Sequence, residues 1–423
     1  MKVVHVIPVM DPRTGGPPAV VAALLAYLPG TGIDGAVVCY DGWPGDGSRQ
    51  RVEAMLASLP RPVPPPVWLP PLTRREVVTA VTARRQLPAA FAGADLVHIH
   101  GVWDAICPAA ATAARRLGLP YVLSTHGMLE PWAVEGQGRL PRLKKWLRWR
   151  LGWREMLENA AGIHDYRPGP LTVLGHRLPT PVEVIANGIS PPVSAGGAEG
   201  AAGAIAGHVV PSTAGSERGW ASLTARYPAL AGRRVLLSLG RLSVQKGTDT
   251  LAEAFAAVAR HVPDAVLVLA GADYGLGAML RRRHAGLLSS SRLVMPGAVL
   301  GEEKSALLER AVGFVLPSRH EGFSVAVLEA MAAGLPCVLS SACHFPEAEQ
   351  AGAAWTVSPD DPAGLAETLR RLLALPVEAR ADMGRRGREL VLRHYTWPDI
   401  ARRYAAWYGR CTRGGRSRVS SDV

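Results

Sequence analysis

The sequence predicts an α/β protein made of two doubly wound halves, each a parallel sheet covered by helices on both faces. Three observations carry this prediction. Short, apolar, β-branched runs alternate with longer stretches of helical periodicity along the chain. The short runs are apolar on both faces, which is typical of parallel strands covered on both sides. The chain has 423 residues, enough for two domains of about 100–200 residues each.

The first half of the chain follows this alternation from its beginning. A helix is expected over 17–28, starting at Pro17-Pro18, because proline is favoured in the first helical turn. Further helices are predicted near 73–91 and 105–117. Strands are predicted over 2–10, 36–40, 95–101, 121–127 and 182–188. We therefore place a first domain at 1–190.

A stretch rich in small residues then interrupts the pattern between Pro191 and Gly219. Its Gly, Ala and Ser content and its near absence of charge are typical of a flexible linker or a surface insertion. We assign 191–231 to this linker and 232–395 to the second domain.

The second half restarts the alternation after the linker. Strands are predicted over 234–240, 265–271, 292–297, 313–318 and 336–340, with helices near 248–260, 277–287, 301–311 and 324–333. A last helix is expected over 396–410. The polar residues 411–423 after it are expected to be a disordered tail.

The chain is strongly basic, with 47 Lys+Arg against 35 Asp+Glu and a formal net charge of +12. Such a charge raises the possibility of a nucleic-acid or anionic-membrane partner. Nucleic acid is disfavoured, because no fold signature and no groove pattern of basic and aromatic residues occurs outside one segment. The five cysteines have neither metal-site nor disulfide spacing. Without a signal peptide or a long apolar run, we expect a cytoplasmic protein, soluble or peripherally attached to a membrane.

That one segment is 140–155, which is dense in Arg, Lys and Trp. Its apolar residues follow helical spacing and include Leu143, Trp146, Leu147 and Leu151. Two interpretations remain open. The segment is either a packed helix with a solvated basic face, or an interfacial helix drawn to anionic lipid.

The turn after the predicted strand 234–240 places two cations before a helix. Arg241 follows Gly240 directly, and Lys246 comes five residues later. Two cations beside a helix N-terminus can bind a diphosphate, because both favour negative charge. The spacing is not that of a Walker A loop. Taken alone, the turn is more typical of an ordinary surface loop.

The turn after strand 313–318 carries two carboxylates around a helix start. Glu321 lies just before the helix, and Ser324 is placed to cap it. Gly322 lets the backbone approach a ligand closely. Glu329 is expected on the helix but off its buried face, which Val325, Leu328, Met331 and Ala332 would form. The two carboxylates are typical partners for sugar and ribose hydroxyls, while two solvated glutamates are the simpler alternative.

Two turns of the first half also lie at the carboxyl ends of strands, where doubly wound sheets bind ligands. Gly15-Gly16 forms a turn that allows close approach. His126 lies at the end of strand 121–127, and His98 and His100 point to one face of the preceding strand by period two. The convergence of three histidines favours a functional role without saying which one acts.

These motifs together resemble glycosyltransferase family 4, the retaining nucleotide-sugar transferases of GT-B fold. The resemblance rests on GRLSVQKG (240–247) and PSRHEGFSVAVLEAMAAGLPCV (317–338), which occur in the family's order. HIHGVW (98–103), HGMLEPWA (126–133) and HYTWPDIARRYAAWY (394–408) agree with it over nearly the whole chain. HGMLEPWA resembles a subgroup found with bacterial surface polysaccharides. The resemblance implies two Rossmann-like domains facing a cleft, with helix 396–410 packing back on the first.

The resemblance also implies roles for individual residues. Arg241 and Lys246 would bind the donor diphosphate, Glu329 the ribose hydroxyls and Glu321 the sugar hydroxyls. His126 matches a position where many members carry a functional histidine. The residues expected to bind the donor are Gly15, Gly16, Arg241, Lys246, Glu321, Gly322, Phe323, Ser324 and Glu329; those expected to act in catalysis are Glu321, His126, Arg241 and Lys246.

The implied reaction needs no metal and no cofactor beyond the nucleotide-sugar substrate, since the two cations stabilise the leaving diphosphate. A glycan, lipid-linked or small-molecule hydroxyl would accept the sugar. Another GT-B enzyme is the alternative, such as a nucleotide-sugar epimerase or an α-glucan phosphorylase. A phosphorylase would need a pyridoxal phosphate lysine, for which Lys246 and Lys304 stand in poor contexts. The third possibility is a basic protein that binds membranes or nucleic acid without catalysis.

Overall fold

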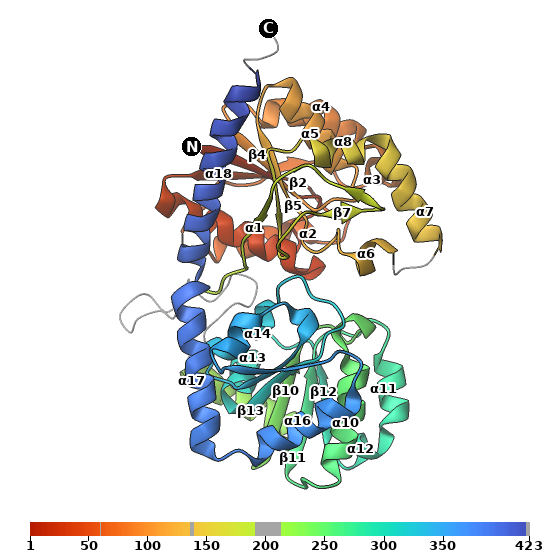
Figure 1. The fold of residues 1–423 in the computed structure, drawn as a ribbon, viewed down its shortest axis with the longest axis vertical. Helices are drawn as coiled ribbons and strands as arrows, with labels where there is room; N and C mark the ends of the chain where they lie inside the picture. Colours follow the sequence, from red (N-terminus) through yellow and green to blue (C-terminus); the bar gives the residue numbers. More distant parts are fainter. Residues whose placement is uncertain (60, 136–138, 191–212, 420–423) are drawn as a thin grey trace. The chain divides into compact units, whose positions relative to one another are not determined.

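A computed structural model describes residues 1–59, 61–135, 139–190 and 213–419. These residues form two compact units, each built on its own parallel sheet (Figure 1). The first unit runs to Ala186 and includes the chain again from Trp397, and the second runs from Asn187 to Thr396. The α/β fold class with two doubly wound halves is therefore confirmed. Among the residues that the structure describes, no helix is long and apolar enough to cross a bilayer.

The sheet of the first unit has the strand order β3-β2-β1-β4-β5-β6-β9, with every neighbouring pair parallel. Because the chain crosses from β1 to β2 on one side and reaches β4 on the other, the order reverses beside β1. Ligands of doubly wound sheets bind at such a reversal, outside the carboxyl ends of the strands. The strands are β1 (Lys2–Val6), β2 (Asp34–Tyr40), β3 (Val67–Leu69), β4 (Leu96–His100), β5 (Tyr121–Ser124), β6 (Gly162–Asp165) and β9 (Val182–Val184).

Helices cover both faces of this sheet and bury two separate apolar layers. One layer joins the sheet to α4, α5 and α8, and the other joins it to α1, α2 and α18. A short hairpin of β7 (Thr172–Val173) and β8 (His176–Arg177) lies outside the sheet. The helices are α1 (Gly16–Tyr27), α2 (Ser48–Ala57), α3 (Arg74–Thr79), α4 (Val81–Ala90), α5 (Ile106–Arg116), α6 (Pro131–Glu135), α7 (Arg139–Arg148), α8 (Arg154–Glu158) and α18 (Trp397–Val419).

The last helix, α18, packs on the first unit although its sequence follows the second. Trp397, Tyr404 and Tyr408 are fully buried there. The helix continues past the predicted end at residue 410, so the expected disorder of 411–423 is wrong for 411–419, and 420–423 lie outside the described residues. Cys411 is buried in the same apolar layer, and the Thr412 hydroxyl donates to the Tyr408 carbonyl at 3.1 Å. The buried Cys411 thus extends the packing of the helix on the first unit beyond its predicted end at residue 410.

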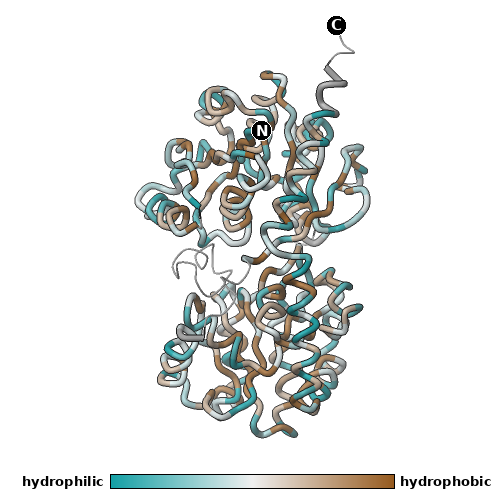
Figure 2. The backbone as a smooth tube through the Cα atoms, turned by 90° about the vertical axis from the view of Figure 1, so that its left-hand side faces the viewer, coloured by the Kyte–Doolittle hydropathy of each residue, from teal (hydrophilic) through white to brown (hydrophobic). Residues whose placement is uncertain are grey.

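The sheet of the second unit has the order β12-β11-β10-β13-β14-β15, again parallel throughout, and reverses beside β10. Figure 2 shows hydrophobic segments running through the interior of this unit, in keeping with a sheet covered on both faces. The strands are β10 (Arg234–Leu239), β11 (Ala265–Ala270), β12 (Leu293–Gly297), β13 (Ala311–Leu316), β14 (Cys337–Ser340) and β15 (Ala354–Val357). The helices are α9 (Thr213–Arg226), α10 (Thr248–Ala259), α11 (Gly277–Arg283), α12 (Ala285–Ser289), α13 (Gly301–Arg310), α14 (Val325–Ala332), α15 (Pro346–Gln350), α16 (Pro362–Ala374) and α17 (Val377–His394).

Helix α9 occupies part of the predicted linker. Residues 191–212 lie outside the described residues, but 213–226 are helical and pack on α13, so the expected linker does not extend to 231. A Cβ atom at Gly219 would lie 2.1 Å from the Glu302 carbonyl oxygen, which shows how closely the two backbones approach. Ion pairs of Arg218 with Glu302 and of Arg226 with Glu303 border this contact. The small residues that resemble a linker here permit close helix packing.

Replacing Gly219 by Ala should force α9 away from α13 and lower the free energy of unfolding by about 1–3 kcal/mol, the usual cost of overpacking. Gly286→Ala is the matched control, because a Cβ atom there meets nothing within 4 Å. Chemical denaturation followed by circular dichroism measures both. Equal stability of the two variants would show that α9 does not pack on α13 as described.

Candidate active site

The loops after β10 and β13 meet at the carboxyl edge of the second sheet. After β10 the chain passes Arg241, makes a 3₁₀ turn over Val244–Lys246 and enters α10 at Thr248. Gly247 has a φ of +63°, and a Cβ atom there would lie 2.1 Å from the Pro317 carbonyl oxygen. Glycine is therefore required twice over, by the left-handed backbone and by the approach of the second loop.

Arg319 holds these two loops together. Its guanidinium donates to both Asp249 carboxylate oxygens at 2.7 and 2.9 Å and to the Val244 carbonyl at 2.7 Å. Its backbone N–H donates to the Gln245 carbonyl at 2.9 Å. Burial alone would raise the pKa of Asp249, but the bonds from Arg319 hold it below its usual value. The sequence analysis missed Arg319, although it stands two residues before Glu321.

Lys246 and Glu321 form a buried ion pair across this junction. Glu321 is 5% exposed, and its Oε1 also accepts a bond from the Ser318 hydroxyl at 2.8 Å. Arg241 lies farther out, with its guanidinium 5.0 Å from the centre of the Tyr274 ring and 3.3 Å from Gln245 Oε1. The structure thus joins Lys246 and Glu321, which the sequence placed in two separate turns, while Arg241 contacts Tyr274 and Gln245.

Glu329 lies on α14 and is buried rather than projecting from the helix. It is 3% exposed and accepts a 2.6 Å bond from Lys304 Nζ on α13. The predicted position off the buried face is wrong, because α14 is covered on most of its surface and its buried residues run from Val327 to Ala332 without a break. Lys304 makes this burial possible by pairing the charge. Sequence reasoning missed this role, since the two residues lie in different helices.

The residues between the two glutamates connect the loop to the interior of the second unit. The Phe323 ring stacks on Tyr395, with centroids 5.7 Å apart, and its carbonyl accepts a 3.1 Å bond from Asn187. Ser324 occupies the N-cap position of α14, as predicted, but its side chain makes no capping bond. Gly322 lies between Glu321 and Phe323 at the turn into this packed segment.

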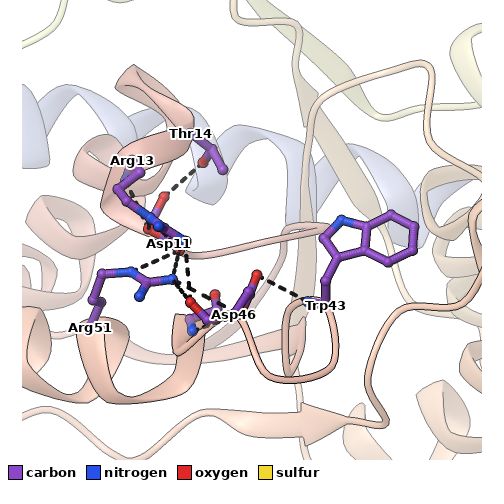
Figure 3. Close-up of polar contacts among 7 residues, drawn as sticks. Asp11, Arg13, Thr14, Trp43, Asp46 and Arg51 are labelled. Atoms are coloured by element: carbon purple, nitrogen blue, oxygen red, sulfur yellow. Dashed lines mark hydrogen bonds and ion pairs between the residues drawn. The ribbon is translucent and has the colours of Figure 1, made fainter. Parts of the chain in front are cut away.

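At the carboxyl edge of the first sheet, the buried carboxylate of Asp11 holds the 3₁₀ turn Pro12–Thr14, which directly precedes Gly15-Gly16 (Figure 3). Asp11 accepts bonds from the backbone N–H of Arg13 at 2.9 Å and from the Arg51 guanidinium at 2.6 and 3.0 Å. Burial would raise the pKa of Asp11, but these bonds hold it well below its usual range. Arg51 also bonds the Asp46 carbonyl at 2.7 Å, which ties the turn to the start of α2. Gly15, with φ +116°, then opens α1 without a side-chain cap.

Histidines gather on one face at the same edge of the first sheet. The rings of His98 and His100 lie 3.9 Å apart, and His100 Nδ1 lies 3.0 Å from His126 Nε2. The sequence analysis missed His5 on β1 and His164 on β6, which complete the cluster. Burial lowers the pKa of His5 and of His126 to about 3, so both rings are neutral at neutral pH.

Within the described residues, His5, His98 and His100 offer nitrogen atoms within 4.8 Å of one another, close enough to consider a metal ion. Both ring nitrogens of His98 already bond protein atoms, the Tyr408 hydroxyl at 2.7 Å and the Ser124 hydroxyl at 2.8 Å. Both nitrogens of His100 are likewise used. A metal would have to break these bonds, so the cluster fits a hydrogen-bonded network better than a metal site.

The basic, Trp-rich segment forms two helices rather than one. A π-helical turn over Trp149–Trp153, with Gly152 at φ +106°, separates α7 from α8. Trp149 and Trp153 are buried in the first unit. Four apolar side chains remain exposed, Leu143 at 52%, Trp146 at 44%, Leu147 at 47% and Leu151 at 73%. The segment therefore anchors itself by two tryptophans and presents an apolar surface beside exposed basic residues.

Comparison with known proteins identifies the family. Residues 15–164 match the glycosyl transferase 4-like domain and residues 233–375 match the glycosyl transferases group 1 domain. The chain therefore belongs to the family 4 type of glycosyltransferases with GT-B fold, as the sequence motifs predicted.

Individual relatives agree with this assignment. The chain is 34% identical over 184 residues to GDP-mannose:cellobiosyl-diphosphopolyprenol alpha-mannosyltransferase of Xanthomonas campestris, covering 43% of this chain and 48% of the relative. It is 34% identical over 200 residues to glycogen synthase of Mycobacterium tuberculosis, covering 45% and 47%. The matches thus span about half the length of these curated relatives.

Solved structures share the fold over nearly the whole chain. Sucrose-phosphate synthase from Thermosynechococcus elongatus superposes with a TM-score of 0.67 at 19% identity, covering 97% of this chain and 98% of the other. Anabaena HepE in complex with UDP and glucose gives 0.67 at 16% identity, covering 97% and 99%. At these identities the likeness concerns the fold alone.

Removing Lys304 should be costly, because the buried carboxylate of Glu329 would lose a cation at hydrogen-bond distance. We expect Lys304→Met to lower the free energy of unfolding by about 3–5 kcal/mol. Adding Glu329→Gln should restore part of that loss, since the neutral amide is easier to bury. Arg218→Met, which breaks an exposed pair with Glu302, should cost less than about 1 kcal/mol. A Lys304→Met loss no larger than that of Arg218→Met would contradict the buried pair.

Proposed function

We propose that this chain is a retaining glycosyltransferase that moves a sugar from a nucleotide-diphosphate donor to a hydroxyl acceptor in polysaccharide or glycoconjugate synthesis. The observation that carries the proposal is the largely buried Lys246–Glu321 pair, in the two loops at the carboxyl edge of the second sheet, the first of which also carries Arg241. This arrangement supplies both cations for a diphosphate and a carboxylate for sugar hydroxyls within one pair of loops. Membership of a family of nucleotide-sugar transferases supports it.

Arg241 and Lys246 are proposed to bind the donor diphosphate and to neutralise it as it leaves. Negative charge develops on the leaving phosphate oxygen, and fixed cations stabilise that charge without reorganising during the reaction. The start of α10, directly after Lys246, adds backbone N–H groups with the same preference for anions. The proposed reaction therefore draws its charge stabilisation from the chain's own cations.

Glu321 is proposed to accept hydrogen bonds from the sugar hydroxyls, and Glu329 to bind the ribose of the nucleotide. We propose a front-face substitution, in which the departing phosphate oxygen takes the proton of the acceptor hydroxyl while an oxocarbenium-like sugar lies between them. The bond from the anomeric carbon to the phosphate oxygen breaks, and the bond to the acceptor oxygen forms on the same face. A double displacement through an enzyme nucleophile is the competing mechanism.

On the first unit, the Gly15-Gly16 turn and His126 are proposed to contact the donor or the acceptor. The turn follows β1, where the strand order reverses, and His126 follows β5 at the same carboxyl edge of the sheet. The Asp11–Arg51 network fixes the turn, and hydrogen bonding to His100 fixes the ring of His126.

The donor test begins with the nucleotide sugars that the relatives name. One relative is named for GDP-mannose, and HepE was solved with UDP and glucose. We expect the chain to release free nucleotide from GDP-mannose or UDP-glucose faster when a hydroxyl acceptor is present. An epimerase would instead convert the nucleotide sugar without any acceptor, so conversion with no acceptor dependence would contradict the proposal.

Removing any of the three central groups should abolish most turnover and leave the fold intact. Arg241→Ala, Lys246→Ala and Glu321→Ala are each expected to lower kcat by about 10²–10³, the usual effect of losing one charge-stabilising contact. Arg282→Ala, an exposed arginine on α11, is the matched control and should keep wild-type turnover. Near-wild-type turnover of any of the first three would overturn the site.

We propose further that α7 and the turn after it contact the inner face of the membrane, where a lipid-linked acceptor would reside. The exposed Leu143, Trp146, Leu147 and Leu151 lie among basic residues, which favours anionic lipid. The relative from Xanthomonas campestris is named for a diphosphopolyprenol acceptor, which supports a lipid-linked substrate.

Trp146→Ser/Leu147→Ser should weaken binding to vesicles that contain anionic lipid by at least about tenfold, because two large apolar side chains no longer enter the interface. Leu300→Ser is the control, since Leu300 is 73% exposed but lies on the second unit. Vesicle sedimentation measures both. Wild-type protein that does not sediment with anionic vesicles, or equal binding of the two variants, would refute the membrane contact.

A further inference from the structure

Three imidazoles form a hydrogen-bonded chain across the first sheet. His5 Nδ1 lies 3.0 Å from His100 Nε2, and His100 Nδ1 lies 3.0 Å from His126 Nε2. His5 lies on β1, His100 ends the neighbouring strand β4, and His126 follows β5. His5 and His100 are fully buried, whereas His126 is half-buried at the sheet edge. Burial lowers the pKa of all three rings, so each is neutral at neutral pH.

Because the three imidazoles are neutral, the two hydrogen bonds that join them must both be donated in the same direction along the row of histidines. A neutral imidazole carries one N–H and one lone pair, so each ring that uses both nitrogens accepts at one and donates at the other. Two arrangements are possible. Protons are donated either from His126 towards His5, or from His5 towards His126.

His5 Nε2 distinguishes between these two arrangements, because it is buried and has no hydrogen-bond partner. If the bonds ran from His126 to His5, this atom would carry a buried, unpaired N–H, which folded proteins rarely tolerate. If the hydrogen bonds are donated from His5 towards His126, His5 Nε2 carries no proton and keeps only a lone pair. The last N–H then falls on His126 Nδ1, at the half-buried end of the chain, where water or a ligand can accept it.

A second hydrogen-bonded network, which contains His98 and His164, does not alter the bonds between His5, His100 and His126. His98 bonds Tyr408 and Ser124, and the Ser124 hydroxyl bonds His164 Nδ1 at 2.9 Å. His164 Nε2 then donates to the Ile185 carbonyl at 2.7 Å. None of these bonds uses a nitrogen of His5, His100 or His126.

We infer that His5 and His100 fix His126 in the Nδ1–H tautomer, so that His126 presents a hydrogen-bond donor, and not a base, to an oxygen atom of the sugar substrate. His5 and His100 are positioning residues that act through His126. The backbone of His126, with a φ of 49°, holds the ring at this place in a left-handed conformation. The tautomer of His126 follows from the three hydrogen-bonded histidines alone, whereas the assignment of a sugar oxygen as the acceptor rests on the proposed function.

Nitrogen NMR of the full chain labelled with ¹⁵N-histidine tests the tautomer directly, without substrate. The His126 signals are assigned by their loss in His126→Asn. We expect His126 to be protonated at Nδ1 in the wild type and to exchange between tautomers in His5→Leu. His5→Asn should restore the wild-type tautomer, because its amide N–H can replace the Nδ1–H donor. Protonation of wild-type His126 at Nε2 would overturn the inference, and so would a His5→Leu spectrum identical to the wild type.

Kinetics of two matched variants test the donor role. Asn and Asp both tolerate the left-handed backbone at residue 126, but only Asn offers an N–H. With GDP-mannose or UDP-glucose, we expect His126→Asn to keep about a tenth of wild-type kcat and His126→Asp to lose about 10²–10³. A His126→Asp variant more active than His126→Asn would overturn the donor role. Absence of wild-type turnover would refute the proposed function instead, and the NMR experiment would still decide the tautomer.

Discussion

The contacts of Arg319 hold together the two loops that form the candidate site of the second unit. One guanidinium bonds Asp249 and Thr250 on α10, the Val244 carbonyl in the loop after β10 and Asp360 before α16. Because arginine offers five donors in a rigid plane, a single side chain can fix several loop positions at once. Only with these loops fixed does Lys246 reach Glu321. The ion pair at the candidate site thus depends on a neighbouring ion pair that touches no substrate in our proposal.

In the first unit, loops at the sheet edge are also joined by ion pairs, but the signs of the charges are reversed. There the buried group is a carboxylate, Asp11, and two arginines from different segments converge on it. In both units a charged side chain at the carboxyl edge pairs with a residue distant in the chain, Arg319 with Asp249 and Asp11 with Arg51, and each pair fixes a loop conformation. Arg13, Arg51 and Arg319, which are among the arginines that raised the question of a nucleic-acid partner, are therefore paired with carboxylates of the chain itself.

The sequence was sufficient to predict what each turn contains but not what each side chain contacts. Strand ends followed by Gly240, Arg241 or Gly15 are local patterns, and the parallel sheet places them at one edge. The pairing of Lys246 with Glu321 joins residues 75 positions apart, and no local rule specifies it. Glu329 was misplaced for the same reason, because helical periodicity cannot show that Lys304 on another helix will pair its charge. Likewise His5 became interpretable only when β1 was found beside β4.

Because Lys246 is paired with Glu321, we expect Lys246 and Arg241 to have different roles at the proposed donor site. Because the pair is neutral overall, it would add little net attraction for the donor diphosphate that we propose, and the more exposed Arg241 would supply the excess positive charge. Lys246 has three N–H donors and gives one to Glu321, so a phosphate oxygen can be added without breaking the pair. Under the proposed function, the Glu321 carboxylate would meanwhile accept hydrogen bonds from the sugar hydroxyls. We therefore interpret Arg241 as the residue that attracts the donor and Lys246 as the one that aligns diphosphate and sugar with each other.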